Sequence, residues 1–206
     1  MRIIPLGLGL ALGVLAAGTV FAADLVVERS VMAPVADDSW HPYVKLFGGA
    51  TVPNTLTFNG TDYDLDAGWL LGGAIGFGAV DGLSFELDGT YSDAGYSGFP
   101  NDLLGATFMG NVVLTGALSD QVAVYGGVGL GAVGLQYDQD PDSDWGYGAG
   151  GQVFAGVSFD VADNVSIFGE ARYQAAFDTI EVDHAGHVDD LGFARTSLLA
   201  GVKFGW

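Results

Sequence analysis

LGFARTSLLAGVKFGW, residues 191–206, ends the chain. From Ala194 onward the even-numbered positions are almost all apolar, whereas the odd-numbered positions include Arg195, Ser197 and Lys203. Successive side chains of a β-strand point to opposite faces, so this alternation indicates a strand. The stretch therefore predicts a C-terminal strand with one apolar face and one polar face.

The last residues place Gly201, Phe204 and Trp206 in the pattern Gly-x-x-Phe-x-Trp. This pattern resembles the terminal strand of bacterial outer-membrane β-barrels, whose closing aromatic residue helps the barrel-assembly machinery to recognise its clients. The resemblance implies that these three residues form an assembly signal, although Leu199 stands where that family often has a polar residue. An open strand edge in lipid has unpaired backbone N–H and C=O groups, and each such group costs roughly several kcal/mol. The rest of the chain is therefore expected to close the sheet.

The composition fits this expectation. The chain has 206 residues, no cysteine, 34 glycines, 50% hydrophobic residues and only 15% charged ones, yet its formal net charge is −19. Such a mixture is too apolar and too rich in glycine for an ordinary soluble domain. The two facts agree if the charge is confined to loops and an enclosed lumen. An acidic chain with so few basic residues is also not expected to bind nucleic acid.

Residues 1–22 have the pattern of a secretory signal peptide. Arg2 is followed by an apolar run that ends at Phe21, and Ala22 supplies a small residue at the cleavage position. A transmembrane anchor is the alternative, because the run approaches spanning length. The acidic segment that begins at Asp24 favours the cleaved signal peptide.

Residues 23–40 are polar, contain Pro34 and alternate poorly, which predicts a periplasmic N-terminal linker. Together with Trp40, this segment resembles the mature start of the major surface-antigen barrels of alphaproteobacteria. Residues 41–206 are expected to form a single outer-membrane β-barrel, broadly similar to the OmpA-like and porin-like families.

Alternation with a period of two recurs along the rest of the chain and predicts an all-β fold. The predicted strands are residues 42–51, 66–78, 83–91, 104–115, 121–137, 145–160, 165–177 and the C-terminal strand. Each can reach the roughly 9 to 11 residues that a bilayer crossing needs, and an even number of strands is typical of these barrels. We therefore predict an eight-stranded antiparallel up-and-down transmembrane β-barrel.

The connections between the predicted strands alternate in length. Short ones lie around residues 81–82, 119–120 and 163–164, and long ones cover residues 52–65, 92–103, 138–144 and 178–190. Short periplasmic turns and long extracellular loops are expected of an outer-membrane barrel. The pattern therefore predicts an integral protein of the cell outer membrane with both termini in the periplasm.

Seven charged residues fall on the predicted inward face: Lys45, Glu86, Asp88, Glu170, Arg172, Arg195 and Lys203. The interior of an eight-stranded barrel is only wide enough for side chains to fill it. An unpaired charge there would have a desolvation cost of roughly several kcal/mol. We therefore expect a lumen charge network that largely plugs the barrel, helped by inward Tyr125, Phe154 and Phe168.

Three motifs could indicate other chemistry. Residues 129–134 match a dinucleotide fingerprint by letter, but they lie inside a predicted strand with no helix after it. Residues 138–144 begin like a calcium loop but lack its glycine and closing glutamate. His184 and His187, among carboxylates, could bind a transition metal. We interpret the last two as acidic surface loops, and we predict no catalytic residue, no metal and no cofactor.

These observations predict a non-enzymatic integral outer-membrane protein that contributes to envelope structure and displays acidic extracellular loops. A narrow porin-like channel for ions or small solutes is the main alternative, and a surface adhesin or a lipid A-modifying enzyme are further ones. The expected partners are outer-membrane lipid, lipopolysaccharide and, during insertion, the barrel-assembly machinery. The protein is expected to be a monomer.

Overall fold

The computed structural model describes residues 41–52, 55–58, 61–64, 67–79, 82–94, 103–137, 145–184 and 187–206. The predicted signal peptide, the predicted linker and the acidic stretch 138–144 lie outside these residues. Within the described part of the chain, no helix is long and apolar enough to cross a membrane.

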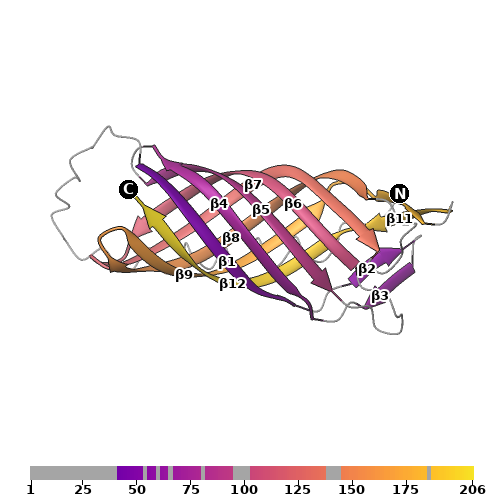
Figure 1. Ribbon diagram of the computed structural model, residues 1–206, viewed down its shortest axis with the longest axis horizontal. Coiled ribbons are helices and arrows are strands. Elements are labelled where there is room, and N and C mark those ends of the chain that lie inside the picture. Colours follow the sequence, from indigo (N-terminus) through magenta and orange to yellow (C-terminus); the bar gives the residue numbers. More distant parts are fainter. Residues whose placement is uncertain are drawn as a thin grey trace, which may run out of the picture. The chain divides into compact units, whose positions relative to one another are not determined.

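Eight of the described strands close into an antiparallel barrel (Figure 1). They are β1 (His41–Val52), β4 (Trp69–Gly78), β5 (Leu83–Ala94), β6 (Leu103–Ala117), β7 (Val122–Tyr137), β8 (Gly146–Ala162), β9 (Val165–Ala176) and β12 (Ala194–Gly205). Their order around the barrel is β1-β12-β9-β8-β7-β6-β5-β4, and β1 closes the ring by pairing with β4. The predicted eight-stranded barrel is confirmed.

The C-terminal strand has a partner on each edge, as the sequence requires. β12 pairs with β1 from Tyr43↔Gly205 to Val52↔Thr196, and it pairs with β9 on its other side. The seam between the first and last strands is therefore a full-length ladder. This pairing leaves neither edge of β12 open to lipid.

At one end of the barrel the strands are joined by short turns, as predicted. In the first turn Gly82 has a φ of 79°, and a Cβ there would collide with the carbonyl oxygen of Thr115. Glycine tolerates both constraints because it has no Cβ. In the second turn Ser119 Oγ accepts a hydrogen bond from the backbone N–H of Val122 at 3.1 Å. We call this end, where β1 also begins and β12 ends, the turn rim.

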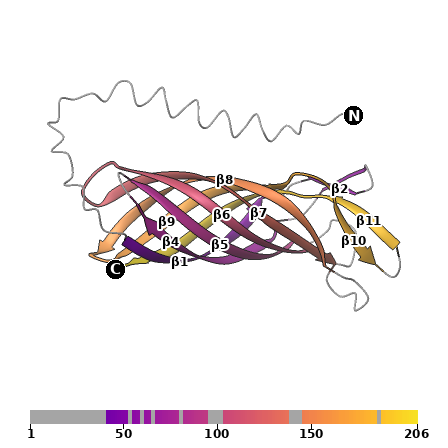
Figure 2. The ribbon, with the colours of Figure 1, turned by 90° about the horizontal axis from the view of Figure 1, so that it is seen from above.

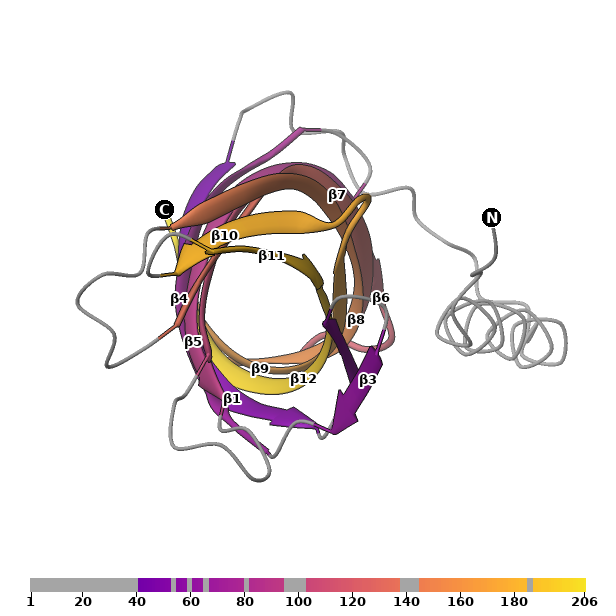
Figure 3. The same ribbon diagram turned by 90° about the vertical axis from the view of Figure 1, so that its right-hand side faces the viewer.

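At the opposite end, four short strands form a separate sheet (Figures 2 and 3). β2 (Thr55–Phe58), β3 (Thr61–Asp64), β10 (Ile180–His184) and β11 (His187–Gly192) pair in the order β10-β11-β2-β3. The connection after β1 contains β2, and the connection after β9 contains the β10–β11 hairpin. The pairing of β11 with β2 therefore links these two connections. We call this end the hairpin rim.

The prediction that residues 178–190 form a loop is wrong about its conformation, because most of this segment forms the β10–β11 hairpin. Ile180 and Val182 are at most 1% exposed, whereas Glu181 between them is exposed. The segment thus has one apolar face in the two-residue rhythm of a strand. This alternation was missed in the sequence because it covers only a few residues and lies among acidic ones.

The barrel wall alternates between outward apolar and inward buried residues, as predicted. In β12, for example, Leu198 is 59% exposed and Leu199 only 5%. Aromatic side chains lie on the outer surface near both rims. Trp69 and Tyr91 contact each other, with ring centroids 5.9 Å apart, and Trp206 is 69% exposed at the turn rim. Such rings favour the depth of lipid headgroups.

Candidate functional site

The middle of the lumen is organised around Arg172, which is 2% exposed. Its Nε and Nη2 each lie 2.8 Å from Glu170 Oε1, and its Nη1 lies 3.0 Å from Asp88 Oδ2. Glu170 is on β9, whereas Asp88 is on β5 across the barrel. The guanidinium therefore ties two distant strands together and offsets the desolvation cost of three buried charges.

Two amides complete the shell of Asp88. Asn111 Nδ2 and Gln152 Nε2 donate to Asp88 Oδ2 at 3.1 and 2.8 Å, and Gln152 Nε2 also lies 2.7 Å from Asn111 Oδ1. The same carboxylate oxygen therefore meets one guanidinium and two neutral donors. This arrangement joins β5, β6, β8 and β9 through one buried atom.

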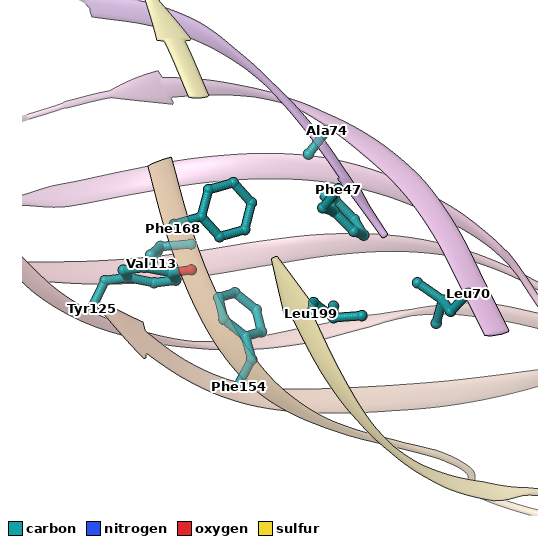
Figure 4. Packing of buried hydrophobic residues seen from close by; sticks show 8 residues of the cluster. All are labelled: Phe47, Leu70, Ala74, Val113, Tyr125, Phe154, Phe168 and Leu199. Carbon is teal, nitrogen blue, oxygen red and sulfur yellow. The ribbon is translucent and has the colours of Figure 1, made fainter. Parts of the chain in front are cut away.

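Aromatic rings gather in the lumen, where Tyr125, Phe154 and Phe168 lie close to one another (Figure 4). Tyr125 is in edge-to-face contact with Phe154 and Phe168, with ring centroids 6.4 and 6.3 Å apart. Its hydroxyl donates to Glu170 Oε2 at 3.1 Å. A Cβ at Gly156 would overlap the Tyr125 ring, so this inward glycine provides the space that the ring occupies. The rings thereby fill space that charges alone would leave open.

Lys45 lies among these rings and is 5% exposed. Its Nζ is 2.7 Å from Glu86 Oε2, and it lies 4.9 Å from the ring centroid of Tyr125 and 5.3 Å from that of Phe168. Tyr43 donates a hydrogen bond to the same Glu86 oxygen at 3.2 Å. One carboxylate and several ring faces together compensate the buried ammonium group.

Arg195, nearer the hairpin rim, is held by neutral groups. Its guanidinium donates to Gln174 Oε1, to Ser92 Oγ and, at 3.2 Å, to Thr90 Oγ1. Among the described residues, no carboxylate lies within ion-pair distance of Arg195. Its positive charge is therefore solvated by side-chain oxygens instead of being paired.

A chain of amides connects Arg195 to Asp88. Gln174 Oε1 accepts from Arg195, and Gln174 Nε2 donates to Gln152 Oε1 at 2.8 Å. Gln152 Nε2 then donates to Asp88. Each amide turns its oxygen toward the positive end and its nitrogen toward the negative end, so the hydrogen bonds strengthen one another in a medium of low dielectric constant.

An apolar cluster, which we call the cap, fills the lumen at the hairpin rim. Its members are Met109, Val133, Leu135, Ile180, Val182, Leu191 and Phe193. A Cβ at Gly146 or Gly148, on the inner face of β8, would meet Ile180, so these glycines make room for β10. Beneath the cap, Gln174 is 0% exposed. The cap therefore covers Gln174, the amide nearest this end.

All seven predicted lumen charges face the barrel interior, and all except half-buried Lys203 are buried. The structure brings five of them together as ion pairs, namely Lys45 with Glu86 and Arg172 with Glu170 and Asp88. Arg195 and Lys203 have no carboxylate within ion-pair distance among the described residues. The expectation that buried charges pair therefore fails for Arg195, because neutral acceptors satisfy its donors. What the charges contribute to function stays a prediction.

Sequence reasoning missed the roles of Asn111, Gln152 and Gln174. Each falls on the inward face of a predicted strand, so the alternation places them in the lumen. Which strands meet across the lumen depends on register and barrel closure, and neither can be read from one strand alone. The cap was missed because its β10 residues lie in a segment interpreted as a loop.

The three residues of the predicted assembly signal lie at the seam and the turn rim. Gly201 faces inward, where a Cβ would crowd Phe47 and Phe168. Phe204 and Trp206 are 42% and 69% exposed on the outer surface. Recognition by the assembly machinery stays a prediction.

The other motifs are placed as follows. The dinucleotide-like stretch 129–134 lies inside β7, as predicted. His184 and His187 are register partners in the hairpin. Among the described residues, no group of three His, Cys, Asp or Glu side chains could hold a metal ion.

The chain matches the family model described as "Outer membrane protein beta-barrel domain" over residues 11–204. It is similar in structure to Neisserial surface protein A, with 17% identity, coverage of 80% of this chain and 96% of that one, and a TM-score of 0.60. It also matches the N-terminal β-barrel of Pseudomonas aeruginosa OprF, with 15% identity, coverage of 83% and 99%, and a TM-score of 0.49. No curated protein sequence matches the chain significantly. The family match, over a closed barrel with an apolar exterior, shows that the chain belongs to the outer-membrane β-barrel domain family and is an integral outer-membrane protein.

Proposed function

We propose that this protein is a closed, non-enzymatic barrel that contributes to the structure of the cell envelope. The observation that carries the proposal is the filling of the lumen: Asp88, Arg172 and Gln174 are at most 2% exposed at mid-barrel. A porin keeps a water-filled interior. Here side chains cross-link opposite walls where such a channel would run, which favours a mechanical role over transport.

The proposed orientation places the turn rim in the periplasm and the hairpin rim outside. Its support is the contrast between short turns and longer connections. Residues 53–68, 95–102, 138–145 and 177–193 contain no Lys or Arg, so the outer surface would be acidic. Lipopolysaccharide phosphates would then require divalent cations to approach it. The barrel-assembly machinery is the proposed partner during insertion, and the folded protein is proposed to be a monomer.

Single-channel recording in a planar bilayer tests the closed lumen. The wild type should show no steady open-channel current, because the charge network and the cap act as two closures in series. Glu170→Ala disrupts the charge network and leaves the cap in place. Replacement of residues 179–191 by a short turn removes the hairpin part of the cap and leaves the charge network in place. Each single change should conduct less than the two combined. Steady wild-type currents would instead favour the narrow porin-like channel.

Mass spectrometry of lipid A from cells with and without the protein tests its non-enzymatic character. Unchanged lipid A is expected. A modified species that appears only with the protein would establish the lipid A-modifying alternative.

A further inference from the structure

We propose that the barrel binds one small inorganic anion, of the size of a halide ion, in a cavity between Lys45 and Lys203 at the turn rim. The cavity measures about 40 Å³ in the space open to the centre of a water molecule. A water-sized sphere occupies roughly 10 to 15 Å³ by that measure, so the cavity accommodates a halide ion and one or two waters.

Two positive charges face each other at this site. Lys45 on β1 and Lys203 on β12 are register partners across the seam. Their ammonium groups lie 5.9 and 5.4 Å from the ring centroid of Tyr43. Like charges placed directly opposite each other destabilise a strand pair. The seam would therefore be strengthened by a negative charge between them.

The nearby carboxylates do not place a negative charge between the two lysines. Glu86 is turned toward Lys45, at 2.7 Å, and the described lining of the cavity contains both lysines but not Glu86. Asp160 is exposed at the rim and accepts a hydrogen bond from Ser166 at 2.6 Å. Among the described residues, no carboxylate lies within ion-pair distance of Lys203. One positive charge at the cavity thus lacks a close counter-charge.

The remaining lining offers donors that suit an anion. Ser84 and Ser158 line the cavity and are each 8% exposed. The Tyr43 hydroxyl lies 3.2 Å from Glu86 Oε2 and 3.4 Å from Ser84 Oγ, so its one proton points to the nearer carboxylate, and the Ser84 hydroxyl can rotate its own proton toward the cavity. Ser158 Oγ has no hydrogen-bond partner among the described residues. Two ammonium groups and two hydroxyl donors would repel a cation and solvate a halide ion.

The first experiment uses the refolded full barrel and measures thermal unfolding in sodium gluconate and in sodium chloride at constant ionic strength. A ligand that binds only the folded state stabilises it by an amount that grows with the logarithm of the ligand concentration once that concentration exceeds Kd, and the Tm rises accordingly. We expect the Tm of the wild type to rise with chloride along this logarithmic dependence, and we expect the rise to be lost in Lys203→Gln. An identical chloride dependence in both proteins would overturn the proposal.

Anomalous diffraction from crystals grown in sodium bromide locates the ion directly. We expect one bromide peak between Lys45 and Lys203 in the wild type and none in Lys203→Gln. Asp160→Asn is the matched control, because it removes a charge from the same rim without removing a donor to the ion, and it should keep the peak. Water alone in the cavity, or loss of the peak in the control, would refute the site. Neither measurement depends on whether the lumen conducts.

Discussion

The half of the lumen near the turn rim is filled by charges and rings, whereas the half near the hairpin rim is filled by amides and then by aliphatic side chains. Arg172 has two carboxylate partners in the first half, and Arg195 has neutral oxygens in the second. The barrel wall supplies every group of the charged half, but the cap requires β10 from outside the wall. The same tube is thus closed in two physically different ways.

The difference decides how each half should respond to mutation. Removing one member of a buried ion pair leaves an uncompensated charge, which costs about 3 to 5 kcal/mol. Removing a neutral partner leaves an unsatisfied dipole, at about 1 to 3 kcal/mol. Removing a cap side chain leaves a void that the hairpin can relieve by moving. A substitution in the charged half should therefore lower the free energy of unfolding more than one in the other half. Its effects should also extend over more of the barrel.

The largest effect is expected from Glu170→Ala. It removes two contacts from Arg172 and the hydrogen-bond acceptor of Tyr125. The free energy of unfolding should therefore fall by about 3 kcal/mol. The loss stays near the lower end of the range for a broken buried ion pair because Arg172 keeps its contact with Asp88. Urea unfolding in detergent micelles measures it. Glu170→Gln keeps the acceptors and removes only the charge, so it should lose less. Equal losses in the two variants would show that packing, and not charge, stabilises this half.

A smaller and more local effect is expected from Ile180→Ala in the cap. Truncation of a fully buried isoleucine costs about 2 to 5 kcal/mol, and the lower end applies here because the site lies at a barrel end. Hydrogen exchange should accelerate in β10 and β11 and stay unchanged in the middle of β9. Exposed Thr179→Ala is the control. Faster exchange throughout the barrel would mean that the two halves form one cooperative unit.

Gln174→Leu should cost about 1 to 2 kcal/mol, because it removes one acceptor from Arg195 and the donor to Gln152 Oε1. A double-mutant cycle with Gln152→Leu tests whether the amides act as one chain. The combined loss should be smaller than the sum of the single losses, since either change already breaks the link to Asp88. Strict additivity would show that the two amides act independently.

The smallest effect on stability is expected from Trp206→Ala. The side chain is 69% exposed, so the free energy of unfolding in micelles should change by no more than about 0.5 kcal/mol. Insertion into the outer membrane of cells should nevertheless fall, if Trp206 is part of the assembly signal. Leu118→Ala, 65% exposed at the same rim, is the control. Equal insertion of both variants would argue against the signal.

The sequence by itself determined the eight barrel strands, their faces and the barrel residues that enter the lumen. The reason is local: the period of two appears in each strand regardless of its neighbours. Lys45, Glu86, Arg172 and Arg195 could be placed inside because each alternates with outward apolar residues. The apolar exterior and the alternating lengths of the connections then predicted a membrane barrel.

Only the tertiary structure decided which of these groups meet. Arg172 reaches Asp88 across the barrel, and Arg195 finds Gln174 in place of a carboxylate, because closure and register fix distances between residues far apart in sequence. The β10 hairpin shows the same limit. Its buried face depends on the space that Gly146 and Gly148 leave on β8, and that space exists only once the barrel has formed.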